Sequence, residues 1–189
     1  MDYIVVGLGN PGKEYERTRH NVGFSVVDIL CRRFGAKLKK ETPNSLGSSI
    51  VISGKKVLLI EPTTYMNESG IAVGEVVRRY KTKVENLVVV HDELDLELGM
   101  VRLKVGGGLA GHNGLKSIKQ HLKNDSFTRV RIGIDKPTHK TQGASHVLKP
   151  MSKKELEVID IACEQAADAV ELIIGDSLDA AMRTIHTQL

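Results

Sequence analysis

Short apolar runs alternate with polar, glycine-rich loops along the chain. The run Tyr3–Val6 has the length and composition of a buried strand. After a polar loop, apolar residues recur every four positions over Asn21–Phe34, which predicts an amphipathic helix. Asn21 is expected to be its N-cap, and Gly35 to lie just beyond its end.

The same order of strand, polar loop and helix recurs along the chain. The further expected elements are a hairpin of Ile50–Ile52 and Val57–Ile60, a helix over Ile71–Tyr80, strands over Leu87–Val90 and Val101–Val105, a helix beginning near Asn113, a strand over Arg129–Ile134, a helix from Ser152 to Gly175 and a last helix capped by Ser177. Three segments are typical of loops: Lys37–Lys40, Thr42–Ser49 and Lys136–Pro150. The pattern predicts an α/β fold, with one domain over residues 1–189 and a mixed, mostly parallel, twisted sheet covered by helices on both faces.

Polar residues gather where the expected strands end. In open α/β sheets, ligands bind at the carboxyl ends of the strands, so these loops are favoured positions for chemistry. They hold Asn10, Tyr15, His20 and Asn21 after the first strand, Tyr65, Met66 and Asn67 in a later loop, His91, Asp92 and Glu93 after another strand, and His112 and Asn113 after a run of glycines.

Basic residues are segregated along the chain. Of 27 Lys and Arg, 12 fall within Val101–Lys154 against two acidic residues, so that window carries +10 and the remainder −6. Such a face is expected to attract a polyanion, with Arg129 and Arg131 on the exposed side of their strand. Aromatic residues are 4% of the chain and Trp is absent, which favours phosphate contact over base stacking.

Several common classes of site lack a signature. Gly7, Gly9 and Gly12 match a dinucleotide fingerprint, but Pro11 interrupts it and the helix pattern starts only near Val22. Walker, G-x-S-x-G and C-x-x-C patterns and metal-type histidine spacing are absent, so neither a cofactor nor a metal is expected. The two cysteines fit helical core positions. No apolar run approaches the roughly 18 residues of a membrane span, so we expect a cytoplasmic protein without membrane contact.

His20 and Asp92 form the strongest candidate catalytic pair. An imidazole titrates near neutral pH and can accept a proton from water, while a carboxylate on its other nitrogen fixes the tautomer. Asn10, Asn67 and Asn113 lie in three separate polar loops, and amides can hold a peptide group without adding charge. Alone, each of these asparagines would be interpreted as a turn or cap residue, and it is their shared location that favours a site.

Four blocks of the chain resemble the signature blocks of the bacterial peptidyl-tRNA hydrolase family. They are GLGNPGKEYERTRHNVG, PTTYMNESG, HDELDLELG and GGGLAGHNGLKSI, in that order. The resemblance implies a monomeric α/β enzyme that hydrolyses the ester joining a peptide to the terminal ribose of tRNA.

The resemblance also implies roles for individual residues. His20 matches the catalytic base and Asp92 the carboxylate that orients it. Asn10, Asn67 and Asn113 match the residues that hold peptide and water, with Asn10 and Asn67 close to the reacting carbonyl. Tyr15, Asn21, Met66 and His112 would complete the substrate-binding residues. Lys104 and Arg131 match a pair that clamps the 5′-phosphate of tRNA.

Some positions depart from the family's usual pattern. Leu109 and Ala110 stand where more polar or glycine-rich sequence is common, Asp135-Lys136-Pro137 replaces Gly-His-Pro, and Glu97 replaces a frequent proline. We expect altered loop rigidity or tRNA contact there. Two alternatives stay open: a non-catalytic RNA-binding protein that uses the same basic face, and a general esterase for which that face is incidental.

Overall fold

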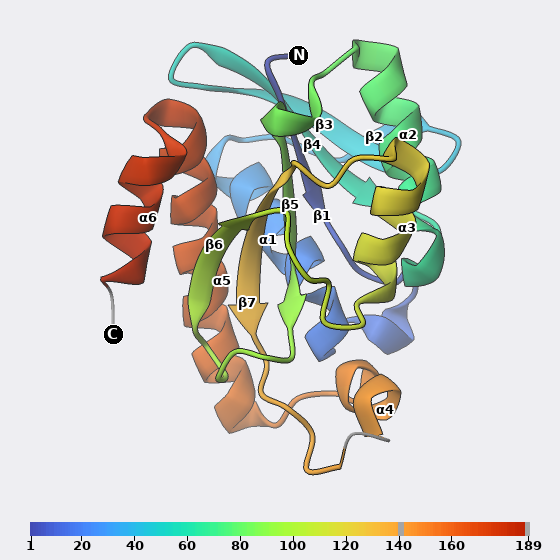
Figure 1. Cartoon of the computed structure of the whole chain (residues 1–189), viewed down its shortest axis with the longest axis vertical. Helices are drawn as coiled ribbons and strands as arrows, with labels where there is room; N and C mark the ends of the chain where they lie inside the picture. Colours follow the sequence, from blue (N-terminus) through green and yellow to red (C-terminus); the bar gives the residue numbers. More distant parts are fainter. Residues whose placement is uncertain (140–141, 188–189) are drawn as a thin grey trace.

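The computed structural model describes residues 1–139 and 142–187, which form one α/β domain around a seven-stranded sheet (Figure 1). The strands are β1 (Tyr3–Gly7), β2 (Lys39–Thr42), β3 (Ser45–Ile52), β4 (Lys55–Pro62), β5 (Leu87–Glu93), β6 (Val101–Val105) and β7 (Thr128–Gly133). The α-helices are α1 (Val22–Arg33), α2 (Ser69–Tyr80), α3 (Asn113–Leu122), α4 (Gly143–Leu148), α5 (Lys153–Gly175) and α6 (Leu178–His186). Short 3-10 turns are η1 (Lys13–Tyr15), η2 (Arg19–Asn21), η3 (Met66–Glu68) and η4 (Val84–Asn86).

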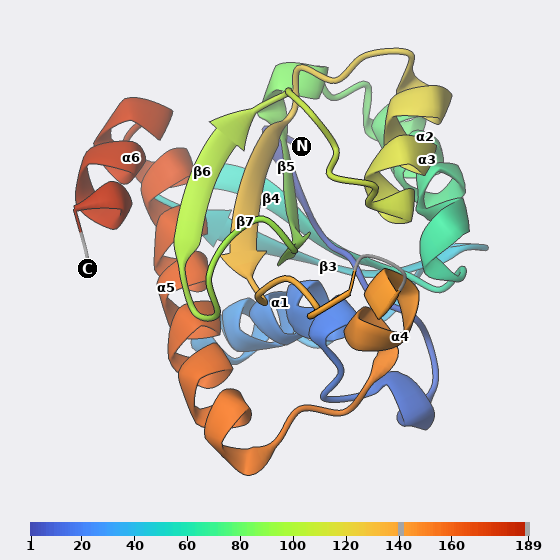
Figure 2. The same cartoon turned by 60° about the horizontal axis from the view of Figure 1, so that its bottom comes forward.

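The sheet is mixed, as predicted, in the order β2-β3-β4-β1-β5-β7-β6. The four strands β4, β1, β5 and β7 are parallel neighbours, while β3 and β6 pair antiparallel to them. The carboxyl ends of β1, β5 and β7 therefore meet at one edge of the sheet, near the short helix α4 (Figures 1 and 2).

Two apolar layers cover the two faces of the sheet. On one face, Val5, Val88 and Val130 pack against α1 and α5. On the other face, Ile4 and Val89 pack against α2 and α3, which lie beside β1 and β4 and leave the β6–β7 side of that face without a helix (Figure 1). The alternation of inward positions along each strand produces both layers.

Local signals account for the starts of α5 and α6 and for one tight turn. Ser152 accepts a hydrogen bond from Glu155 N at 3.2 Å, and Ser177 accepts one from Ala180 N at 3.0 Å, so both predicted caps are confirmed. Ser53 and Gly54, with φ of 49° and 79°, form the two-residue turn of the predicted β3–β4 hairpin.

All three predicted loops, Lys37–Lys40, Thr42–Ser49 and Lys136–Pro150, were wrong in part. Lys39–Thr42 and Ser45–Ile52 are paired strands, although lysines and serines hide the usual alternation of a strand. The polar segment before Pro150 contains helix α4. This helix is only six residues long, which is too short to show the periodic spacing of apolar residues typical of a helix. Residues 140 and 141 of that predicted loop lie outside the described residues.

Candidate active site

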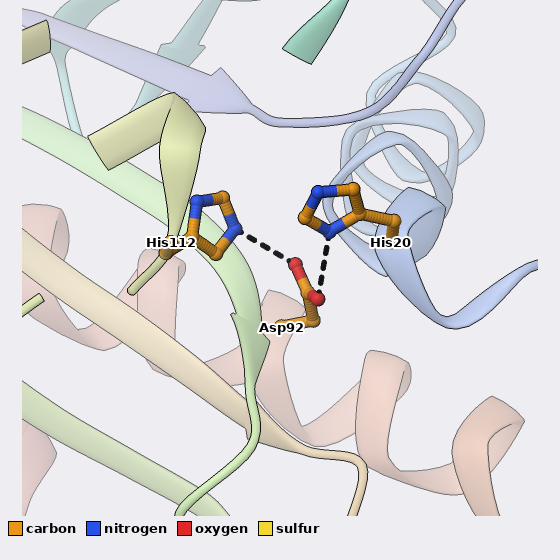
Figure 3. A group of neighbouring side chains, drawn as sticks. All are labelled: His20, Asp92 and His112. Atoms are coloured by element: carbon orange, nitrogen blue, oxygen red, sulfur yellow. Dashed lines mark hydrogen bonds and ion pairs between the residues drawn. The ribbon is translucent and has the colours of Figure 1, made fainter. Parts of the chain in front are cut away.

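A histidine–aspartate–histidine cluster lies at the carboxyl end of β5 (Figure 3). His20 comes from η2, Asp92 from β5, and His112 from the residue before α3. His20 Nδ1 lies 2.8 Å from Asp92 Oδ2, and His112 Nε2 lies 2.9 Å from Asp92 Oδ1. The predicted convergence of His20 and Asp92 is therefore confirmed, and His112 joins them.

Close backbone packing brings His20 to this position. A Cβ on Gly23 would lie 2.4 Å from Leu8 N and 2.5 Å from Val90 O, so only glycine lets α1 begin against the ends of β1 and β5. A Cβ on Gly7 would similarly lie 2.2 Å from Gly23 O. The glycines near the first strand thus serve helix–strand packing, which agrees with the rejection of a dinucleotide site.

Hydrogen bonds determine the tautomers of both imidazoles in their neutral forms. Leu115 N donates to His112 Nδ1 at 3.3 Å, so His112 carries its proton on Nε2 and donates it to Asp92. His20 donates from Nδ1 to the same carboxylate, which leaves its Nε2 lone pair available to accept a proton. His112 also serves as the N-cap of α3, a role that the sequence analysis missed.

In this cluster the carboxylate favours a protonated His20, and the imidazoles favour an ionised Asp92. Burial lowers the pKa of His20, but the charge and hydrogen bond of Asp92 raise it more, so the net shift is upward. Burial alone would raise the pKa of Asp92, yet the two adjacent imidazoles hold it well below its usual range. Asp92 therefore remains a carboxylate that can stabilise an imidazolium on His20.

The same three side chains have a spacing that could accommodate a metal ion, with one ligand atom from each within 4.8 Å of the others. Their hydrogen bonds oppose that use, because each imidazole nitrogen facing Asp92 carries a proton in the neutral tautomers described above. Binding a cation there would require His112 to give up the bond from Leu115 N or lose its proton.

A second group joins the first polar loop to η3. Asn10 N donates to Asn21 Oδ1, and Asn21 Nδ2 donates to Asn10 O, both at 2.9 Å. Asn10 Oδ1 accepts from Met66 N at 2.7 Å. Asn21 was predicted to cap α1, but its side chain is committed to Asn10 and makes no cap bond. Within the described residues no hydrogen bond uses Asn10 Nδ2, which stays available as a donor.

A cleft of about 270 Å³ opens over the cluster. His20, Asp92, His112 and Asn113 line it from one side, and Gly143, Ala144 and Val147 of α4 complete it. Since α4 was not predicted, these helical residues were missed as components of the site.

Of the other predicted substrate-binding residues, Tyr15, Asn21, Met66 and Asn67 are not among the described residues that line this cleft. Met66 is buried, Asn67 is exposed, and the ring of Tyr15 packs edge-on against Tyr65 at 6.4 Å between centroids. A neighbouring cleft of about 560 Å³ contains Asn10 and Asn21 in its wall.

That neighbouring cleft also contains a buried acid that the sequence analysis missed. Glu61, at the end of β4, is 9% exposed, and its Oε1 has no hydrogen-bond partner within the described residues. Burial, followed by the negative charge of Asp28 on α1, raises the pKa of Glu61 to about 9.

The basic residues on β6 and β7 occupy the part of the sheet face that no helix covers. Lys104 is paired with Arg129 and Arg102 with Arg131, so all four lie on the same side of the two antiparallel strands. Lys104 and Arg131 are half-buried, and their predicted contact with a tRNA phosphate stays a prediction. Lys140, which the charge count included, lies outside the described residues.

Arg129 was expected on the exposed face, and that expectation was wrong. Its exposed fraction is 0%, and its Nη1 donates to Gly106 O at 3.0 Å and Gly108 O at 2.8 Å. The glycine-rich segment folds over the guanidinium and buries it. Strand alternation gives the side of the sheet, but it gives no information on what covers that side.

The structure and the residue pattern define a single-domain α/β protein with an imidazole base at the carboxyl ends of its strands, an arrangement suited to hydrolysis. The sequence model of the peptidyl-tRNA hydrolase family matches residues 4–189. The chain belongs to that family.

Individual relatives agree with this membership. Peptidyl-tRNA hydrolases of Rhodococcus erythropolis and Mycobacterium avium are 46% and 45% identical to the chain, over 97% of it and 97% and 96% of their own lengths. The crystal structure of the Acinetobacter baumannii peptidyl-tRNA hydrolase superposes with a TM-score of 0.93 at 39% identity, covering 98% of this chain and 95% of that one. The likeness in fold therefore extends over nearly the whole chain.

Proposed function

We propose that the protein hydrolyses the ester between peptide and tRNA in peptidyl-tRNA and releases both. The main support for this proposal is the hydrogen bond of 2.8 Å between His20 and Asp92. It leaves Nε2 of a neutral His20 as a proton acceptor in the cleft. Membership in the peptidyl-tRNA hydrolase family supports the choice of substrate.

In the proposed reaction, His20 Nε2 takes a proton from a water molecule whose oxygen attacks the ester carbonyl. The tetrahedral intermediate then expels the ribose oxygen, which receives that proton back from the imidazolium. Asp92 stabilises the imidazolium, and an asparagine amide, for which Asn10 Nδ2 is available, donates to the developing oxyanion. This scheme uses neither a cofactor nor a metal and forms no covalent intermediate with the enzyme.

Substrate binding is divided between two surfaces. Asn67 and Asn113 are exposed, and we propose that their amides hold the peptide together with Tyr15 and Met66. Lys104 and Arg131 are proposed to bind the tRNA 5′-phosphate, since a flexible ammonium and a planar guanidinium suit that anion.

The deciding experiment is a single-turnover assay on N-blocked aminoacyl-tRNA, run with and without a chelator and beside a small ester. The proposal expects cleavage of the tRNA ester in both conditions and little turnover of the small ester. RNA binding without product would instead identify a non-catalytic RNA-binding protein. Equal turnover of both esters would identify a general esterase, and loss of activity with chelator would contradict the metal-free scheme.

A matched variant tests the proposed base. His20→Ala should bind tRNA as the wild type does and release no peptide, because the general base is lost. Retained turnover would remove His20 from the mechanism.

The setting of the reaction is part of the proposal. We infer that the protein acts as a monomer in the cytoplasm, where tRNA is used in translation. No helix among the described residues is long and apolar enough to cross a membrane. Sedimentation at assay concentration checks the monomer, and a stable dimer would contradict it.

A further inference from the structure

We propose that Arg129 is a positioning residue for the site, because its guanidinium ties the glycine-rich segment Gly106–Gly108 to the strand end that carries Asp92. The inference rests on the proposed function and adds a residue to it. Arg129 is buried and reaches neither the cleft nor the surface, so its effect must pass through the groups it holds.

Three hydrogen bonds define the tether. Arg129 Nη1 donates to Gly106 O and Gly108 O, while Nε donates to His91 Nε2 at 3.1 Å. His91 Nδ1 in turn donates to the backbone oxygen of Asp92 at 2.7 Å. One side chain thus connects the loop before α3 with the backbone of the residue that orients His20.

The acceptor role of His91 requires a neutral ring. Burial lowers the pKa of His91 well below its usual range, and the neighbouring His112 and Arg129 lower it further. A neutral ring with its proton on Nδ1 can accept from Arg129 and donate to Asp92 O at the same time. The ring of His91 also packs edge-on against that of His112, with centroids 5.2 Å apart.

The glycine-rich segment needs external support. Gly106, Gly107 and Gly111 have φ of 59°, 88° and 74°, and Ala110 has φ of 49°, so the backbone follows no regular element there. A segment of this kind is intrinsically flexible, because glycine populates many backbone states. It leads directly into His112 and Asn113, which must be held to about 0.5 Å if they are to act on substrate.

An uncharged residue would have been less costly at this position if packing alone were required. Burying a guanidinium is expensive, and Arg129 Nη2 has no hydrogen-bond partner within the described residues, with Glu93 Oε1 at 3.6 Å. Arg131 Nη1 lies 3.7 Å from the same oxygen, so Glu93 is shared between the buried arginine and the proposed phosphate ligand. What arginine offers in return is a planar fork that can hold two carbonyls and an imidazole in fixed directions.

Arg129→Lys tests the tether, because lysine keeps the charge and loses the fork. We expect kcat on N-blocked aminoacyl-tRNA to fall by about tenfold to hundredfold, with KM and its salt dependence changed less than about threefold. Arg33→Lys is the matched control. Arg33 also binds several partners (Glu164, Asp168 and Glu171), but it lies on α1 away from the cleft. Replacing its guanidinium should therefore leave kcat unchanged. Hydrogen exchange should show faster opening of Gly106–Gly108 in Arg129→Lys only.

The outcomes separate this inference from the proposed function. An inactive wild type would overturn the proposed function, whereas an active wild type with an unchanged kcat in Arg129→Lys would overturn only the tether. A change confined to KM would assign Arg129 to tRNA binding and overturn the tether as well. If Arg129→Lys does not fold, His91→Asn tests the strand half of the tether and should lower kcat without raising KM.

Discussion

Glu61→Gln is expected to stabilise the protein in alkaline solution and to have little effect in acid. The substitution keeps the shape of the side chain and removes its ionisation. Glu61 is buried beside Asp28 at the edge of the 560 Å³ cleft, and its pKa in the folded protein is about 9. In the unfolded chain the carboxyl returns to its ordinary pKa of 4.5.

The magnitude follows from the difference between these two pKa values. A raised pKa contributes stability that is fully present below about pH 4.5 and is lost as the pH rises toward 9. Each pH unit in that window costs the folded state about 1.4 kcal/mol, so the wild type loses up to about 5 kcal/mol between pH 4.5 and 8. Glutamine carries no charge at either pH and can still donate to Asp28 from its amide.

Urea unfolding at pH 4.5 and pH 8 measures the effect. Glu61→Gln should gain up to about 5 kcal/mol over the wild type at pH 8 and less than about 1 kcal/mol at pH 4.5. The control is Glu85→Gln at an exposed position, which should change stability by no more than about 0.5 kcal/mol at either pH. An equal gain at both pH values, or none at pH 8, would refute the assignment of a buried, protonated Glu61.

Three further changes test the site and its loop. Asp92→Asn should lower kcat by roughly 10²-fold or more. Because Asp92 raises the pKa of His20, the acidic limb of the pH profile of kcat/KM should also move to lower pH. An acidic limb at the same pH would show that Asp92 does not set the pKa of the catalytic base. Lys104→Ala and Arg131→Ala should raise KM with little change in kcat and reduce the salt slope by about one, and an unchanged slope would exclude a phosphate contact. Ala110→Gly should stabilise the protein by up to about 1 kcal/mol in thermal unfolding, since φ is 49° there, whereas a loss of stability would show that Ala110 is unstrained.

Two of the departures from the family pattern share a backbone feature. Ala110 and Asp135 both have positive φ, 49° and 63°, where glycine is the unstrained residue. The strain at Asp135 is offset, because its Oδ1 accepts a hydrogen bond from Leu98 N at 2.8 Å. Ala110 has no side-chain bond to offset its strain. Altered loop rigidity at these two positions stays a prediction.

Much of the fold could be predicted because its signals are local. Strand and helix periods, the caps at Ser152 and Ser177 and the Ser53-Gly54 turn each depend on neighbouring residues. The β2–β3 hairpin and α4 could not be predicted, because their own sequence patterns are weak. Pairing with the rest of the sheet stabilises the hairpin, and packing beside η2 stabilises α4.

The sequence by itself determined the periods of the elements, the residue types at the strand ends and, through its blocks, the resemblance to a family of hydrolases. Only the tertiary structure decided which of those residues touch. In the folded chain His112 is hydrogen-bonded to Asp92 and Asn21 to Asn10, and Arg129 and Glu61 are buried. The physical reason is that protonation state, tautomer and hydrogen-bond partner depend on groups brought together from distant parts of the chain.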